Sequence, residues 1–263
     1  MKIILLRGNK IRHNALAKIL YSSGFLAGQV IEDKPPANYS SLSKIEIEHY
    51  NSQSQFEVDF FGNEFLSVNS NVPQLHINAN CLNSIETQNF IKQIDFDLAI
   101  TFGVSILKKS LINALNDKIL GIHLGLSPYY RGSGTNFFPF VNRELEAIGF
   151  TLMRLDEGVD TGLIIHQGRA QIVLGDSIHT IGNRNINVMF KEMMFLLNSN
   201  FQFNNYKIPE RQSTDRFYRR SDFNELSLRV ALKNLEAGLV FEYITKKEMK
   251  NNNYPIFVNP LLS

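Results

Sequence analysis

The hydrophobic positions of the first 123 residues form short runs that alternate with helical patterns. Residues 3–6 are an uninterrupted apolar run, which is typical of a strand buried on both faces. Within residues 14–21, Leu16, Ile19 and Leu20 recur at helical spacing. By the same criteria we expect strands at 26–31, 75–77, 97–102 and 119–123, and helices at 85–94 and 107–115. This alternation predicts an α/β fold with a mostly parallel, Rossmann-like sheet and helices on both faces.

The second half of the chain predicts extended segments at 148–155 and 163–173, on either side of a turn. A long helix is expected at 177–197, with Asp176 or Ser177 as its N-terminal cap. Residues 222–225 resemble a capping box, which predicts another helix that ends near Gly238. We expect the apolar face of that helix to contain Leu226, Val230, Leu232 and Leu235.

These patterns predict a catalytic domain over residues 1–200 and a small, partly helical C-terminal extension over 201–263. Residues 33–72 are polar and contain Pro35 and Pro36, so we interpret them as an insertion in the first domain. The insertion is expected to hold one helix near residues 45–56.

Composition narrows the class of protein. The 263 residues carry 27 Lys and Arg against 25 Asp and Glu, a formal net charge of +2, whereas a dedicated nucleic-acid binder usually shows a basic excess. No apolar run reaches the ~18 residues of a membrane span. The single cysteine, Cys81, excludes an internal disulfide and cysteine-based zinc clusters. The first apolar run is too short for a signal peptide. We therefore expect a cytoplasmic protein with no nucleic-acid or membrane partner.

The turn after the first predicted strand contains Arg7, Gly8, Asn9, Lys10 and Arg12. A dinucleotide-binding fold requires Gly-x-Gly-x-x-Gly here, so that the backbone can approach a pyrophosphate, and only Gly8 is present. NAD and FAD are therefore not expected. The polar side chains could bind a substrate phosphate instead, and ordinary surface charge is an equal alternative.

Two later segments combine reactive side chains with turn residues. His123 ends a predicted buried strand, which places it at the edge of the sheet where ligands bind. Asp160 follows 37 residues later, in a turn bounded by Gly158 and Gly162. A histidine and a carboxylate on adjacent strand ends can form an acid–base pair. The alternative is a structural histidine that hydrogen-bonds to a turn carboxylate.

The same two segments carry a resemblance to a known family. The sequences His-Leu-Gly-Leu-Ser-Pro-Tyr-Tyr-Arg-Gly from His123 and Asp-Glu-Gly-Val-Asp-Thr-Gly from Asp156 resemble the signature of the formyltransferase superfamily. That superfamily includes methionyl-tRNA formyltransferase, glycinamide ribonucleotide transformylase, formyltetrahydrofolate deformylase and the sugar N-formyltransferases. The resemblance covers roughly residues 1–200. The family carries Asn-x-His at the end of the strand, where this chain reads Gly-Ile-His. The family asparagine therefore falls on Gly121, which has no side chain to hold the formyl oxygen.

The resemblance implies a folate-dependent N-formyltransferase, a one-carbon transferase that uses 10-formyltetrahydrofolate and no metal. His123 and Asp160 would be catalytic, with Gly121 at the position of the family asparagine. The residues expected to bind the cofactor are Phe102, Gly103, Val104, Ser105, Leu107, Asp156, Glu157 and Gly158. The residues expected to bind the substrate are Arg7, Asn9, Lys10, Arg12, Ser127, Pro128, Tyr129, Arg131 and Asn136.

Several acceptors remain open. A nucleotide-linked aminosugar leads, and Tyr129, Tyr130, Phe137 and Phe138 could supply stacking faces or belong to the core. The alternatives are an amino-acid or peptide-like amine, methionyl-tRNA, or a catalytically impaired folate- or nucleotide-binding protein. A homodimer is compatible with the sequence. We expect a substitute for the missing asparagine, either an ordered water in the space that glycine leaves or the side chain of Ser127, Ser133 or Asn136.

Overall fold

The computed structural model describes residues 1–35, 38–65, 71–199, 202–203, 206–210 and 215–262. The chain divides into two compact units. Unit 1 contains Met1–Ala37, Glu57–Ile122 and Arg154–Val159, and unit 2 contains Asn38–Phe56, His123–Met153 and Asp160–Ser263. The predicted boundary at residue 200 does not coincide with a boundary between these units. In the described ranges, no helix is long and apolar enough to cross a membrane.

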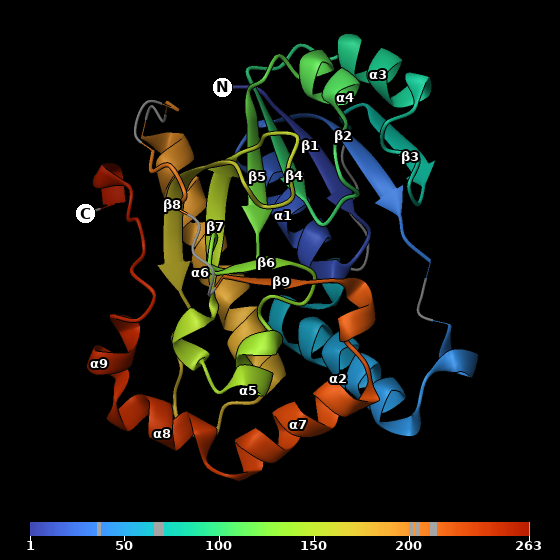
Figure 1. The fold of residues 1–263 in the computed structure, drawn as a ribbon. Helices are drawn as coiled ribbons and strands as arrows, with labels where there is room; N and C mark the ends of the chain where they lie inside the picture. The colour runs from blue at the N-terminus through green and yellow to red at the C-terminus, as the bar shows by residue number, and fades with distance from the viewer. Residues whose placement is uncertain (36–37, 66–70, 200–201, 204–205, 211–214, 263) are drawn as a thin grey trace. The chain divides into compact units, whose positions relative to one another are not determined.

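Unit 1 is built on parallel strands. Its strands follow the order β3-β2-β1-β4-β5, and each neighbouring pair is parallel. Figure 1 shows β1, β2 and β4 side by side, with β1 in the middle. The elements are β1 (Ile3–Gly8), α1 (Ile11–Ser22), β2 (Leu26–Asp33), η2 (Asn63–Phe65), β3 (Gln74–Asn78), α3 (Ile85–Lys92), β4 (Leu98–Phe102), α4 (Lys109–Ala114) and β5 (Ile119–His123), whose last residue belongs to unit 2.

The core of unit 1 explains why the predicted strands form. Ile3, Ile4, Leu5 and Leu6 are all fully buried, as expected for a central strand that is covered on both faces. The even residues Ile4 and Leu6 pack with Val30 and Ala99 of the flanking strands and with Leu111 and Ile112 of α4. The predicted strands and helices of this part of the chain are confirmed, with ends that differ by a few residues.

Unit 2 contains most of the later elements. They are η1 (Tyr39–Ser41), most of α2 (Lys44–Phe61), β6 (Tyr130–Gly132), α5 (Phe138–Asn142), η3 (Leu145–Ala147), β7 (Gly149–Arg154, whose last residue belongs to unit 1), β8 (Leu163–Arg169), α6 (Ile178–Asn198), β9 (Arg216–Tyr218), η4 (Arg220–Asp222), α7 (Glu225–Glu236), α8 (Leu239–Thr245), α9 (Lys247–Asn251) and η5 (Pro260–Leu262). The helix predicted inside the insertion is α2, although residues 36–37 and 66–70 of the insertion lie outside the described residues.

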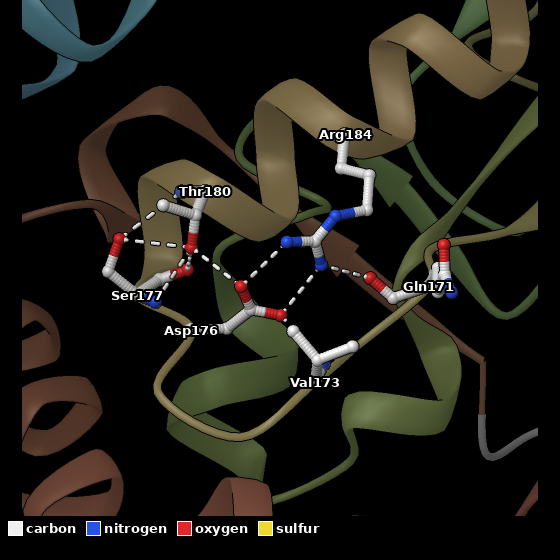
Figure 2. Close-up of polar contacts among 6 residues, drawn as sticks. All are labelled: Gln171, Val173, Asp176, Ser177, Thr180 and Arg184. Atoms are coloured by element: carbon white, nitrogen blue, oxygen red, sulfur yellow. Dashed lines mark hydrogen bonds and ion pairs between the residues drawn. The ribbon is translucent and has the colours of Figure 1, made fainter. Parts of the chain in front are cut away.

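The start of α6 shows how the predicted cap works. The Ser177 hydroxyl accepts from the Thr180 backbone N–H at 3.2 Å, so Ser177 is the N-cap. Asp176 lies one residue earlier and accepts two hydrogen bonds from the Arg184 guanidinium, at 2.7 and 2.9 Å. It also accepts from the backbone N–H of Val173 at 2.8 Å, as Figure 2 shows. Asp176 therefore fastens the loop before α6 to the second turn of the helix.

The C-terminal helices correct two predictions, the N-cap of α7 and part of its buried face. The N-cap of α7 is Asn224, whose side chain accepts from the Ser227 N–H, and not the predicted 222–225 box. The buried face of α7 contains Leu228 and Ala231, and the predicted Leu232 and Leu235 pack partly buried against the same core, whereas Leu226 is 72% and Val230 36% exposed. Apolar residues at 226, 228, 230, 231 and 232 allow two overlapping faces at helical spacing, and tertiary packing selects the one that meets α5.

The predicted helical extension is present as α7, α8 and α9, and it also supplies a strand that the pattern did not predict. The short strand β9 pairs in parallel with β6, as Figure 1 shows. Each has three residues, which is too short for a period of two to stand out from the sequence.

Candidate active site

His123 and Asp160 meet in unit 2. The distance from His123 Nδ1 to Asp160 Oδ1 is 3.2 Å, and the side chains are 7% and 19% exposed. The other ring nitrogen, Nε2, lies 2.9 Å from the carbonyl oxygen of Tyr130. The backbone N–H of Gly132 donates to Asp160 Oδ2 at 2.8 Å. Two backbone groups of β6 therefore hold the two side chains in contact.

This arrangement suits proton transfer. The two nitrogens of His123 face two oxygen acceptors, and a neutral imidazole can donate to only one of them. A ring that gains a second proton donates to both. Asp160 has a left-handed backbone (φ 52°), a conformation that Asp and Asn tolerate better than most residues. The pair can thus take up and return a proton in a fixed geometry.

The space beside Gly121 is occupied by an apolar side chain. A Cβ atom at position 121 would lie 2.3 Å from Leu155 Cδ2 and 2.7 Å from its Cγ. Leu155 packs against the core of unit 1. Leu155 thus occupies the point where a side chain at position 121 would begin, which argues against an ordered water there, and the substitute donor stays a prediction.

The remaining candidates for a substitute donor differ in their contacts. The Ser127 hydroxyl is buried, and no partner for it is present among the described residues. The backbone of Ser127 is held by Thr151 and Gln167, which leaves the hydroxyl as its one unused polar group. In contrast, the Asn136 side chain accepts from the Gly149 N–H at 3.3 Å. The Ser127 hydroxyl therefore remains available for a further hydrogen bond, whereas the Asn136 side-chain oxygen already has a partner.

The loop after β4, in unit 1, is organised by a buried carboxylate. Glu32, at the end of β2, accepts from the Ser105 N–H at 2.7 Å and from the Ser105 hydroxyl at 2.5 Å. It also accepts from the backbone N–H of Asn80 at 2.7 Å. Sequence reasoning missed Glu32, although an acidic residue near the end of a buried strand was a signal that could have found it.

Among the predicted cofactor residues in this loop, Phe102 and Leu107 have buried side chains. Gly103 is exposed, while Val104 and Ser105 are half-buried. A ligand could therefore reach backbone groups near Gly103 more readily than the side chains of Phe102 and Leu107. This exposure pattern suits the expectation that the loop binds through its backbone.

His13 lies directly against the same loop. A Cβ at Gly103 would lie 2.3 Å from His13 Nε2. The rings of His13 and Phe102 are arranged edge to face, with 4.7 Å between their centres. The Lys10 N–H donates to His13 Nδ1 at 3.2 Å. Burial, together with the nearby charges of Arg12 and Lys10, lowers the pKa of His13 well below its usual value. His13 is therefore a neutral ring that supports Gly103.

The predicted turn at 156–158 is held by its own first residue. The Asp156 carboxylate accepts from the Gly158 N–H at 2.9 Å, which closes a local turn. Glu157 points to solvent and forms an exposed ion pair with Lys109 at 3.7 Å. The Asp156 side chain thus has a structural contact, and the backbone of the turn is kept in place.

The polar residues at the end of β1 and just after it have protein partners. Arg7 is buried and donates to Gln29 at 2.9 Å and to Asn14 at 2.6 Å. Burial lowers the pKa of Arg7 to about 10. Arg12 forms an ion pair with Glu57, and Asn9 donates to the Lys34 carbonyl at 3.3 Å. These contacts favour the alternative in which this turn is structural and does not bind a phosphate.

The residues that follow His123 fall into two groups. Tyr130, Phe137 and Phe138 are buried in the core of unit 2, so they are core residues and not stacking faces. Arg131 is half-buried, and its Nε has no hydrogen-bond partner among the described residues. The Arg131 guanidinium lies 5.7 Å from the centre of the Phe217 ring, which is 49% exposed.

Two other predicted substrate residues, Pro128 and Tyr129, flank this segment. Pro128 follows a cis peptide bond after Ser127. The Tyr129 hydroxyl donates to the Pro255 carbonyl at 2.8 Å, which ties this end of the segment to the C-terminal residues. Tyr129 therefore has a structural contact, although its ring is only partly buried.

Comparison with known proteins identifies the family. The family model described as "Formyl transferase" matches residues 38–194, which is more than half of the chain. The chain therefore belongs to the formyl transferase family. It is 30% identical over 105 residues to a methionyl-tRNA formyltransferase from Thermodesulfovibrio yellowstonii, a match that covers 38% of this chain and 33% of that relative. The matched segment thus spans about a third of the relative's own length.

Solved structures share the fold at low identity. The phosphoribosylglycinamide formyltransferase from Anaplasma phagocytophilum has a TM-score of 0.55 at 15% identity, with 84% of this chain and 98% of that chain covered. The N-formyltransferase from Helicobacter canadensis, solved with folinic acid and dTDP-3-aminofucose, has a TM-score of 0.54 at 14% identity, with 89% and 80% covered. The predicted family and α/β fold class are confirmed. The acceptors named for these proteins differ, so the family alone does not choose one.

Proposed function

We propose that this protein transfers the formyl group of 10-formyltetrahydrofolate to the primary amine of a small metabolite, a nucleotide-linked aminosugar. The observation that carries the proposal is the contact between His123 and Asp160, fixed by Tyr130 and Gly132 of β6. Such a contact, in a member of the formyl transferase family, supports an acid–base role over a purely structural one.

In the proposed reaction, the amine nitrogen attacks the formyl carbon and the bond from that carbon to N10 of the folate breaks. The attacking amine loses one proton, and N10 gains one. For His123 to donate a hydrogen bond to the oxyanion that develops on the formyl oxygen, its Nε2–H, which lies 2.9 Å from the Tyr130 carbonyl oxygen, would turn toward that oxyanion or be shared with it. Asp160 orients the ring and accepts the amine proton, directly or through a water, before it is returned to the leaving nitrogen.

The donor-binding role is assigned to Gly103, Val104 and Ser105 and to the turn at 156–158. Glu32 and Asp156 hold these two segments from within unit 1, so the backbone is arranged before a ligand arrives. Pre-arranged backbone groups bind a rigid heterocycle at a small entropic cost. The described residues hold no group of three or more side chains suited to a metal ion, and no step requires one.

The nucleotide-linked acceptor is supported by Arg131 and Phe217. Arg131 has no acidic partner within the described ranges, and a guanidinium is well suited to a phosphate. Phe217 offers an exposed ring against which a base could stack. An amino-acid or peptide-like amine would need the Arg131 guanidinium but not the Phe217 ring. Methionyl-tRNA would need a broad basic surface, which the near-neutral charge does not favour.

A second candidate function rests on Leu155. Because this side chain fills the place of the family asparagine, the chain could bind folate without catalysing transfer. One experiment distinguishes the two functions. The protein is incubated with 10-formyltetrahydrofolate and a panel of amines, and release of tetrahydrofolate is measured. Turnover with nucleotide-linked aminosugars supports the first function. Binding of 5-formyltetrahydrofolate in calorimetry, with no turnover across the panel, supports the second, and no binding at millimolar ligand contradicts both.

A further inference from the structure

The strand β9 is hydrogen-bonded to β6, the strand whose backbone contacts His123 and Asp160. The Arg216 N–H donates to the Tyr129 carbonyl at 2.8 Å, and the Ser133 N–H donates to the Tyr218 carbonyl at 2.9 Å. The register places Tyr130 opposite Arg216 and Gly132 opposite Tyr218. These are the residues of β6 whose backbone contacts His123 and Asp160.

The approach of the two strands depends on glycine. Gly132 has a φ of 89°, and a Cβ at this position would lie 2.1 Å from the Tyr218 carbonyl oxygen. The Gly132 N–H is the group that donates to Asp160. The backbone of β9 therefore packs directly against the residue that fixes the carboxylate.

Side chains lock the same pairing. Glu144 accepts hydrogen bonds from the Tyr130 hydroxyl and from two nitrogens of the Arg216 guanidinium. Asn142 donates to the hydroxyls of Tyr130 at 2.8 Å and Tyr218 at 2.7 Å. The network thus joins both ends of β9 to Tyr130.

The Tyr218 ring is held as firmly as its hydroxyl. It stacks on Phe138 with 3.7 Å between ring centres and 2° between ring planes. Phe138 begins α5 and is buried in the core of unit 2. The stacking and the hydrogen bond from Asn142 leave Tyr218 few ways to move without displacing β6.

We propose that Arg216 and Tyr218 are positioning residues for His123 and Asp160, and that they act through the backbone of Tyr130 and Gly132. Loosening β9 would let the Tyr130 carbonyl and the Gly132 N–H shift, and the geometry of the pair would shift with them. A misplacement of about 1 Å can cost roughly a hundredfold in rate. The rate effect rests on the proposed function, whereas the effect on the His123 ring does not.

The test compares Arg216→Gln and Tyr218→Phe with the control Arg229→Gln. Arg229 also forms a forked ion pair with a glutamate, Glu225, but on the exposed side of α7. The first readout is the nuclear magnetic resonance titration of the His123 ring, which needs no substrate. The second is kcat and KM for the donor, with thermal unfolding measured in parallel.

We expect both β9 variants to change the chemical shifts and titration of His123 and to lower kcat by about ten- to a hundredfold, with KM for the donor nearly unchanged. The Arg229→Gln control should change neither. Tyr218→Phe keeps the stacked ring and is the milder variant, so it remains informative if Arg216→Gln does not fold. A His123 titration equal to that of the wild type in folded Arg216→Gln and Tyr218→Phe would overturn the proposal. A shifted titration without turnover in any form would keep the positioning role and contradict the proposed function.

Discussion

Substitution of Gly121 by alanine tests whether Leu155 really occupies the place of the family asparagine. The new Cβ would lie 2.3 Å from Leu155 Cδ2, well inside van der Waals contact, so one side chain must move. Leu155 packs against a buried core, where overpacking typically costs about 1–3 kcal/mol. We therefore expect Gly121→Ala to lower the free energy of unfolding by about that amount.

The partner substitution removes the obstacle. Leu155 is partly buried, so Leu155→Ala alone should cost about 2 kcal/mol, near the low end for a leucine truncation. In the double variant the alanine at position 121 enters the space that Leu155 vacates. The free energy of unfolding lost in the double variant should then be smaller than the sum of the two single losses by about 0.5–3 kcal/mol, the range for residues in contact.

Urea denaturation of the wild type and the three variants measures this coupling. Additive losses, or a Gly121→Ala variant as stable as the wild type, would refute the reasoning about Leu155. The double variant Gly121→Asn, Leu155→Ala then tests whether the site lacks a hydrogen-bond donor for catalysis. If Ser127 already supplies the missing donor, turnover should not rise above that of Leu155→Ala alone. A rise of about a hundredfold or more would show that the site lacked a donor, because one such donor is worth roughly 10²–10³ in rate.

Three further predictions follow from the site and its supports. His123→Ala should remove most turnover and leave the fold intact, as circular dichroism would show; a near-normal rate would return the residue to a structural role. Glu32→Gln should weaken binding of 5-formyltetrahydrofolate in calorimetry, because it loosens the hydrogen bonds that hold Ser105, and unchanged affinity would contradict this assignment. Burial raises the pKa of Asp176, but hydrogen bonds led by that from Arg184 outweigh it, so the pKa is lowered from 3.8. Stability lost in Asp176→Asn should thus be largest above about pH 4 and vanish as the pH falls through the lowered pKa; a pH-independent loss in urea denaturation would argue against this linkage.

Continuous apolar runs made the first half of the fold predictable. Residues 3–6 are a buried strand, because an uninterrupted apolar segment of that length has few other stable placements in an α/β protein. Residues 119–123, with three apolar side chains, form another. The cap at Ser177 was also predictable, since a serine before a helical pattern can satisfy a free backbone N–H.

The contact between His123 and Asp160 could be predicted from two motifs at strand ends, but its supports could not. The β6–β9 pairing joins segments 86 residues apart along the chain (Tyr130 and Arg216), and three-residue strands carry no periodic signal. The role of Leu155 depends on side-chain packing beside Gly121, which no local pattern encodes. Likewise, the sequence offers Arg7 as a cation that could bind a phosphate. Only its hydrogen bonds to Gln29 and Asn14, which the structure shows, favour a structural role.

The measurement that tests the central claim most directly is transfer of an isotope-labelled formyl group. Wild-type protein and Asp160→Asn are incubated with 10-formyltetrahydrofolate labelled in the formyl carbon and with a nucleotide-linked aminosugar, and the sugar is analysed by mass spectrometry. We predict that the label appears as an N-formyl group on the sugar with the wild type and is nearly absent with Asp160→Asn. Label transfer at equal rates with both proteins, or none with the wild type despite bound folate, would contradict the account.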